Sequence, residues 1–141
     1  MFKGKYMFKP SRLEEDKSVV VLGEKPEGAL VWRFVEKEEN SNSIIMALEV
    51  YAVKKHSLGW SVRAYTLFRF KAGDKVIWTR IKYDSGIISE RELNSRYAVD
   101  ACLSNIYFMW GWYSILDLHL RCFQKELEAY GVSVAEIKKN A

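Results

Sequence analysis

Three stretches between residues 43 and 83 alternate apolar and polar side chains, and this alternation constrains the fold more than any other feature. Successive side chains of a β-strand point to opposite sides of the sheet, so such alternation is typical of half-buried strands. We expect strands at 43–54, 60–71 and 75–83, joined by turns at 56–59 and 72–74. Connections this short predict an antiparallel meander.

One face of this meander is almost wholly apolar and is the predicted core face. Its members are Ile44, Met46, Leu48, Val50, Ala52, Trp60, Val62, Ala64, Phe68, Phe70, Ile77, Ile81 and Tyr83. A face of this composition requires a second layer of structure to cover it.

The region before the meander contains two further β-rich runs, at 18–22 and 29–37. They flank 23–28, which holds two glycines and a proline, and this pattern predicts a hairpin. Residues 2–8 are read as a possible edge strand and 10–17 as a charged connector.

The C-terminal third has the signals of helix. Ser89 and Glu92 form a capping box, in which each side chain satisfies a free backbone N–H group at a helix start. From 93 to 130 apolar residues recur at spacings of mostly three and four, as one buried helical stripe requires. A second, weaker capping box at Ser133 and Glu136 predicts a short terminal helix.

The length of this helical region raises the question of an oligomer. A continuous helix over 90–129 would extend about 60 Å, so we expect it either to break near Gly111 or to reach a partner. Residues 106–116 are apolar on all sides, which indicates a second covering layer or a homodimer formed through the C-terminal helix.

These patterns together predict an α+β fold. We expect an antiparallel sheet of about five to six strands in the N-terminal two-thirds, packed on a long C-terminal helix or helix pair. The 141 residues, 49% of them hydrophobic, suffice for a single domain over 1–141, with the sheet in 1–84 and the helical part in 88–141.

The second face of the meander combines rings with cations and is the predicted functional surface. Residues 43–83 carry 8 Lys or Arg against 2 Asp or Glu, whereas 1–42 carry 8 against 8 and 84–141 carry 6 against 8. Aromatic rings can stack on unpaired bases while cations neutralise phosphates. We therefore predict non-enzymatic binding of single-stranded DNA or RNA through Arg33, Tyr51, Arg63, Tyr65, Arg69, Trp78, Arg80 and Lys82.

Two other functions fit parts of the sequence. A protein-interaction or small-ligand-binding module, with a barrel-like sheet capped by the C-terminal helix, would account for the apolar residues on the second face. A small enzyme acting on a phosphate-bearing substrate would use His56 or His119 as acid or base. No catalytic residue is assigned, because the carboxylates and glycines match no catalytic or phosphate-binding motif.

The sequence predicts neither a metal nor a cofactor. Cys102 and Cys122 lack the spacing of zinc ligands, and buried, reduced thiols are expected. Residues 1–9 do not form the apolar block of a leader, and charges interrupt the apolar stretch at 98–123, which we read as a buried helix and not a membrane span. A cytoplasmic location follows as an expectation.

Overall fold

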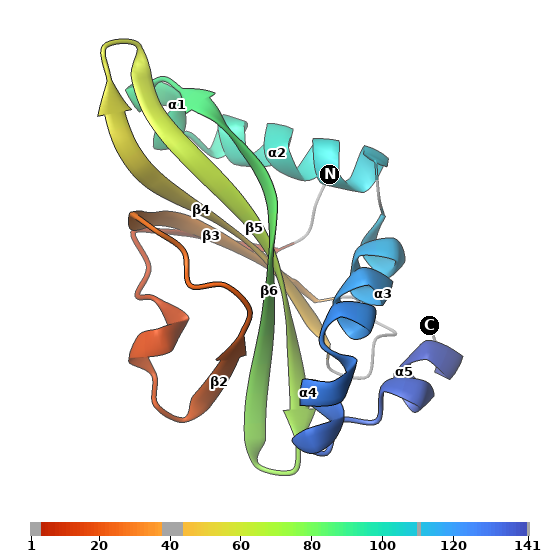
Figure 1. Cartoon of the computed structure of the whole chain (residues 1–141). Helices are drawn as coiled ribbons and strands as arrows, with labels where there is room; N and C mark the ends of the chain where they lie inside the picture. Colours follow the sequence, from red (N-terminus) through yellow and green to blue (C-terminus); the bar gives the residue numbers. More distant parts are fainter. Residues whose placement is uncertain (1–3, 38–43, 110, 141) are drawn as a thin grey trace.

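The computed structural model describes residues 4–37, 44–109 and 111–140, which form a six-stranded sheet with helices on one face and an N-terminal segment on the other (Figure 1). The strand order is β1-β3-β4-β5-β6-β2. The predicted mixture of a largely antiparallel sheet with helices is confirmed. The sheet runs on to residue 88, four residues beyond the expected boundary.

The predicted meander forms the centre of the sheet. Its strands are β4 (Ile45–His56), β5 (Gly59–Ala72) and β6 (Lys75–Ile88), and each pair is antiparallel. The register shifts between Ala52 and Lys54 on β4 and between Ala64 and Tyr65 on β5, so each pair contains a bulge or irregularity that bends the sheet.

The two outer strands come from the first part of the chain. β1 (Lys5–Phe8) pairs with β3 (Ala29–Lys37), and β2 (Val19–Leu22) pairs in parallel with β6. The predicted hairpin of 18–22 with 29–37 is therefore wrong, because its two strands lie on opposite sides of the meander. Residues 23–28 cross the sheet instead of turning back beside it.

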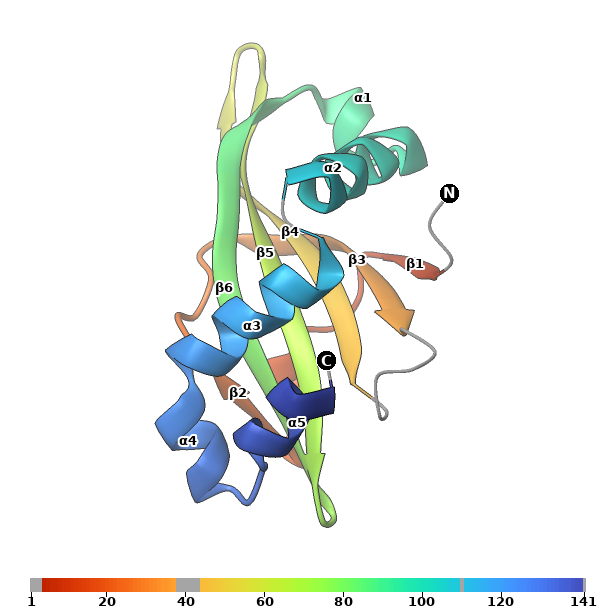
Figure 2. The same ribbon diagram turned by 90° about the vertical axis from the view of Figure 1, so that its right-hand side faces the viewer.

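Five short helices follow in the described residues, and the predicted long helix or helix pair is not confirmed (Figure 2). The helical region is interrupted after Leu93, at Gly111, whose φ is 72°, and at Phe123. The side chain of Ser89 caps the first helix by accepting a hydrogen bond from the Glu92 N–H. The helices are α1 (Glu90–Leu93), α2 (Arg96–Met109), α3 (Trp112–Cys122), α4 (Gln124–Ala129) and α5 (Val134–Asn140). None of the helices in the described part of the chain is long and apolar enough to cross a membrane.

The helices cover the predicted core face, called here the helix side. Phe68 and Ile77 of the sheet are fully buried there, as are Val99 and Leu103 of α2. α3 is amphipathic: Trp112 packs edge-on against Phe68 at 5.3 Å between ring centroids, whereas Tyr113 faces outward. The buried face of α3, which includes Trp112, Ile115 and Leu120, is thus covered from within one chain. The side chains of Tyr107, Phe108 and Met109 and all of Trp110 lie outside the description, and the homodimer stays a prediction.

Residues 9–28, called here the strap, cover the opposite face, the strap side. The strap contains the 3-10 turn η1 (Leu13–Glu15) and β2, and it joins one margin of the sheet to the other. Leu13 and Val21 of the strap pack against a second apolar cluster that includes Leu67 and Trp78. The sheet therefore has a buried layer on both faces.

Candidate functional site

The strap buries most of the predicted nucleic-acid face. Five of the eight predicted residues are at most 7% exposed: Arg33, Tyr51, Tyr65, Trp78 and Arg80. A ring sealed beneath another layer of the chain cannot stack on a base. The premise that this face is open to solvent is wrong, because sequence alternation identifies the members of a face but not what covers it.

The buried charges form an ionic cluster centred on Glu49. Its carboxylate accepts from Nε and Nη2 of Arg33 at 2.9 and 2.7 Å, and from Nε and Nη2 of Arg80 at 3.3 and 3.2 Å. The hydroxyl of Tyr51 donates to Glu49 Oε1 at 2.9 Å. These donors meet the hydrogen-bonding requirement of the buried Glu49 carboxylate within the protein.

The strap completes this cluster from above. Arg80 Nη2 donates to Glu14 Oε1 at 2.7 Å, and Arg33 Nη2 donates to the backbone oxygen of Ser11. The guanidinium of Arg12 lies over the Tyr51 ring, 5.0 Å from its centroid. The groups proposed to hold a polynucleotide thus hold the strap.

Electrostatics reinforces this arrangement. Burial and the Glu49 carboxylate raise the pKa of Tyr51 well above its usual range. Burial alone would lower the pKa of Arg80, but the Glu49 and Glu14 carboxylates outweigh it and the pKa rises. Tyr51 therefore stays neutral and Arg80 stays charged near neutral pH.

The other three predicted residues do not form a continuous track. Lys82 is exposed, whereas Arg63 and Arg69 are half-buried. The Nη1 atom of Arg63 lies 3.6 Å from a carboxylate oxygen of Glu27, which belongs to the strap.

The two histidines lie in different surroundings. His119 is fully buried between the hydroxyls of Thr66 and Thr79, at 2.9 and 2.8 Å from its two ring nitrogens, and burial lowers its pKa to about 3. His56 is exposed and hydrogen-bonds to Ser61. No three His, Cys, Asp or Glu residues of the described chain are grouped to hold a metal, and Cys122 is exposed, contrary to expectation.

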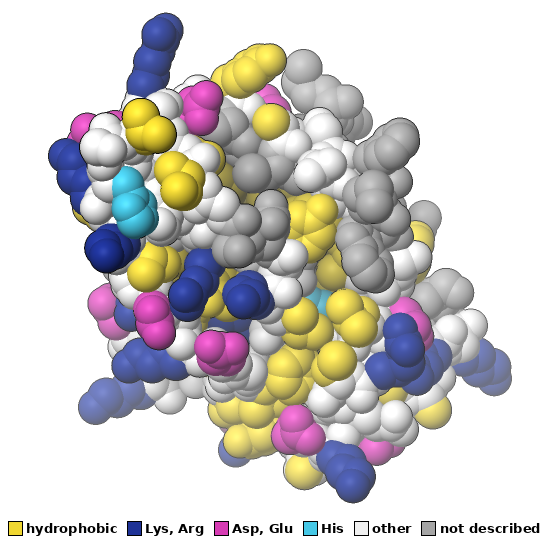
Figure 3. All heavy atoms as spheres, turned by 45° about the horizontal axis from the view of Figure 1, so that its top comes forward, with side chains coloured by type: hydrophobic (Ala, Val, Ile, Leu, Met, Phe, Trp, Pro, Cys, Tyr) yellow, Lys and Arg dark blue, Asp and Glu magenta, His cyan; other side chains and the backbone are white. Residues whose placement is uncertain are grey.

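A different surface carries exposed apolar side chains. The β4–β5 turn and the end of β6, called here the hairpin end, lie together because Ser61 of β5 pairs with Ile87 and Trp60 with Ile88. Leu58 is 86% exposed and Ile87 60%. Figure 3, turned to bring this end forward, shows hydrophobic side chains interspersed with charges of both signs.

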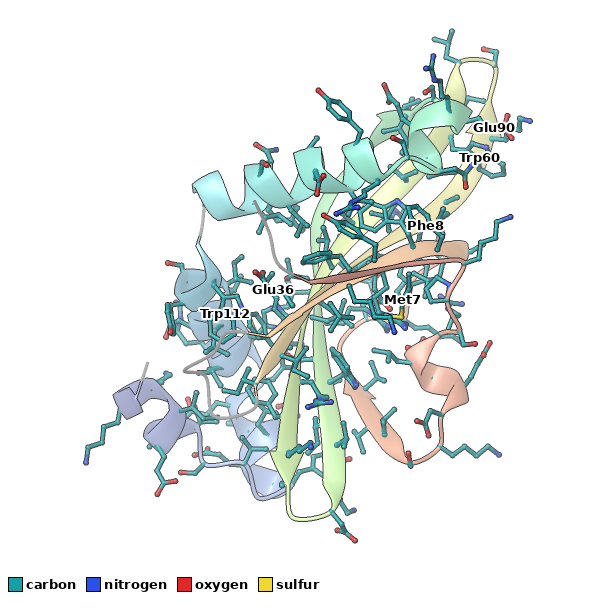
Figure 4. All side chains as sticks on the ribbon, turned by 180° about the vertical axis from the view of Figure 1, so that it is seen from behind. Met7, Phe8, Glu36, Trp60, Glu90 and Trp112 are labelled. Atoms are coloured by element: carbon teal, nitrogen blue, oxygen red, sulfur yellow. The ribbon has the colours of Figure 1, made fainter. Side chains whose placement is uncertain are left out.

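Rings paired with cations lie on the helix side near this end. Lys55 Nζ is 6.0 Å from the Trp60 ring centroid, and Figure 4 shows Trp60 close to Glu90 at the start of α1. Further along the sheet, Arg96 of α2 lies 4.7 Å from the Tyr6 ring centroid. Phe8 of β1 is 44% exposed on the same side.

A recess lies at the opposite end of β5. A groove of about 330 Å³ opens between the β5–β6 turn and α5. Phe70, Val132 and Ile137 supply its apolar lining, and Lys71 and Glu136 also border it.

Comparison of the chain with protein-family models, curated proteins and solved structures gives no match. Two sequence signals mark the hairpin end: an apolar Leu58 inside a turn, where polar residues are usual, and two isoleucines directly before the Ser89 cap. Neither shows by itself that the two segments meet.

Proposed function

We propose that the chain is a non-enzymatic protein-interaction module that binds partner polypeptides at the hairpin end. The exposure of Leu58 and Ile87 at neighbouring strand ends carries this proposal. Single exposed apolar residues are ordinary, but a group of them at one end is typical of an interaction surface. Burying one such side chain stabilises a complex by about 1.5–3 kcal/mol.

The charges around this end favour a protein over a polynucleotide. Lys55 Nζ lies 3.8 Å from a Glu90 oxygen, and Asp100 accepts from the hydroxyl of Tyr6 beside Arg96. Lys55 is thus paired with a carboxylate, and Asp100 and Arg96 meet at Tyr6, whereas binding to phosphates uses cations without such partners. Rings, an arginine and a mixed-charge rim are the usual composition of protein interfaces.

Binding to a library of fluorescein-labelled peptides, measured by anisotropy, tests the proposal. The double variant Leu58→Ser, Ile87→Ser should bind the selected peptides at least about tenfold more weakly, which corresponds to about 1.4 kcal/mol. Tyr113→Ser removes a side chain of 46% exposure on α3 and is the matched control. Equal affinities for the wild type and the double variant would refute a site at the hairpin end.

Binding of single-stranded nucleic acid stays a prediction with its own test. Titration of labelled oligonucleotides at low and high salt should show affinity that falls steeply with salt if phosphates are bound. Sedimentation of the purified chain tests the predicted homodimer.

A further inference from the structure

We propose that Ser57 is the acceptor of a phosphoryl group and that its phosphorylation regulates the hairpin end; the regulation rests on the proposed protein-interaction function. Ser57 and Leu58 form the two-residue turn between β4 and β5, because His56 pairs directly with Gly59. The side chains of residues 54–58 are all exposed, and Figure 2 shows this turn at one extremity of the molecule. Within the described residues the Ser57 hydroxyl has no hydrogen-bond partner, so it is open to an enzyme.

The residues around Ser57 match the charge pattern by which one class of protein kinase selects its substrates. Lys54 and Lys55 lie three and two positions before the serine, and Leu58 follows it directly. Kinases with carboxylates along the substrate groove bind cations at these two positions, and an apolar pocket takes the side chain after the serine. No other serine or threonine of the sequence has a cation at both positions. The sequence pattern therefore singles out Ser57.

Both lysines are available to such a kinase. Lys54 is exposed and forms no ion pair within the described chain. Lys55 pairs with Glu90 at 3.8 Å, but the two side chains are 63% and 67% exposed, and exposed pairs of this kind contribute little stability. A carboxylate of the kinase can therefore replace Glu90 as the partner of Lys55.

The end of the hairpin can open without disturbing the core. The register of β4 with β5 shifts between Ala52 and Lys54, and only three pairs lie beyond this shift, from Lys54 with Ser61 to His56 with Gly59. Local opening of a peripheral segment requires far less free energy than global unfolding. The segment can thus adopt the extended form that a kinase groove accepts.

The reaction is a phosphoryl transfer from ATP. The Ser57 Oγ attacks the γ-phosphorus, the bond from that phosphorus to the β–γ bridging oxygen breaks, and ADP leaves. The hydroxyl proton passes to the catalytic aspartate of the kinase. The product carries about −1.5 to −2 charge at pH 7 and three acceptor oxygens on the turn.

The phosphate lowers the affinity of the hairpin end for an apolar partner. It lies next to Leu58, which is 86% exposed and is one of the two residues that carry the proposed interaction. A partner side chain that packs on Leu58 must then displace water from a charged group, which opposes binding. The new charge also competes with Glu90 for Lys55, so it weakens a contact between the hairpin and α1. Phosphorylation is thus an off switch for this surface.

Phosphate incorporation tests the site itself. The full-length chain is incubated with ATP and the catalytic subunit of the cyclic-AMP-dependent protein kinase, which selects two cations before its serine, and mass spectrometry locates the modified residues. We expect one phosphate, on Ser57, and at least about a tenfold lower kcat/KM for the variant Lys54→Ala, Lys55→Ala. The variant Lys71→Ala, Lys75→Ala, which removes two exposed lysines at the opposite end of β5, is the matched control and should react like the wild type. No phosphate on Ser57, equal rates for the two lysine variants, or incorporation only in urea would overturn the inference.

Peptide binding separates the regulation from the proposed function. The phosphorylated chain should bind the peptides selected from the library at least about tenfold more weakly than the unmodified chain, whereas Ser57→Ala treated with the kinase should bind as tightly as the wild type. Unchanged affinity after phosphorylation would refute the regulation alone. Failure of the unmodified chain to bind any library peptide would refute the proposed function, and the regulation with it, while phosphate on Ser57 would still confirm the modification site.

Discussion

Arg80 and Glu14, separated by 66 residues in the chain, form a hydrogen-bonded ion pair of 2.7 Å that joins the strap to the sheet. The Arg80 side chain is 1% exposed and also contacts the buried Glu49 carboxylate. Because a buried guanidinium needs its carboxylates, the strap and the ionic cluster stabilise each other. The strap is therefore a structural layer and not a loose arm.

Removing the charge of Glu49 should destabilise the protein strongly. Glu49→Gln leaves Arg33 and Arg80 buried with too little compensating charge, and we expect a loss of about 3–5 kcal/mol in the free energy of unfolding. Glu90→Gln is the control, because the exposed pair of Glu90 with Lys55 contributes at most about 1 kcal/mol. Urea unfolding of both variants checks this. Similar midpoints for the two variants would contradict the role of the cluster.

Trp78→Ala should act on stability, because its indole lies in the apolar cluster under the strap. We expect a loss of about 3–5 kcal/mol, as for other buried rings. Lys82→Ala, on an exposed neighbour in the same strand, should change stability by less than about 0.5 kcal/mol. A Trp78→Ala variant that is as stable as the wild type but binds oligonucleotides poorly would instead support the prediction that this face binds nucleic acid.

The meander and its core face were predictable because the alternation of apolar residues reports directly on side-chain direction. Phe68, Phe70 and Ile77 are accordingly buried on the helix side. The Ser89 cap was predictable for a similar reason, since the hydrogen bond to Glu92 depends on residues three positions apart.

Strand partners and covering layers were not predictable in the same way. β2 is a β-rich run, as expected, but its pairing with β6 depends on contacts more than fifty residues away along the chain. The basic and aromatic face looked accessible because Glu14 and Ser11, which complete its hydrogen bonds, lie in a connector without periodicity. Predicting the hairpin end would have required the pairing register of β5 with β6, because this register places Ile87 beside the β4–β5 turn.

Protonation of His119 should make the protein acid-sensitive. Its pKa is about 3 in the folded state against an ordinary 6.5, so between these values the unfolded state binds the extra proton. Stability should therefore fall as the pH drops below about 6.5, by up to about 1.4 kcal/mol per pH unit.

His119→Gln should flatten this dependence, because glutamine does not titrate. Urea unfolding of the wild type and the variant between pH 6.5 and 5 measures how the free energy of unfolding changes with pH in each. The carboxylates are the same in both proteins, so the difference between the two slopes reports on His119. Parallel pH profiles would show that His119 does not remain neutral in the folded protein.

Glycine at position 23 should be required for the strap to reach β6. Its φ of 113° and the 2.3 Å separation between a built Cβ and the Arg80 oxygen leave no room for a side chain. Gly23→Ala should cost about 1–3 kcal/mol in the free energy of unfolding. Gly86→Ala is the matched control, since its Cβ meets no described atom within 4 Å and loss of chain entropy in the unfolded state should stabilise it by about 0.4–1 kcal/mol. Thermal and urea unfolding should show Gly23→Ala to be less stable than the wild type and Gly86→Ala to be more stable. A Gly23→Ala protein of unchanged stability would mean that the strap does not pack tightly against β6.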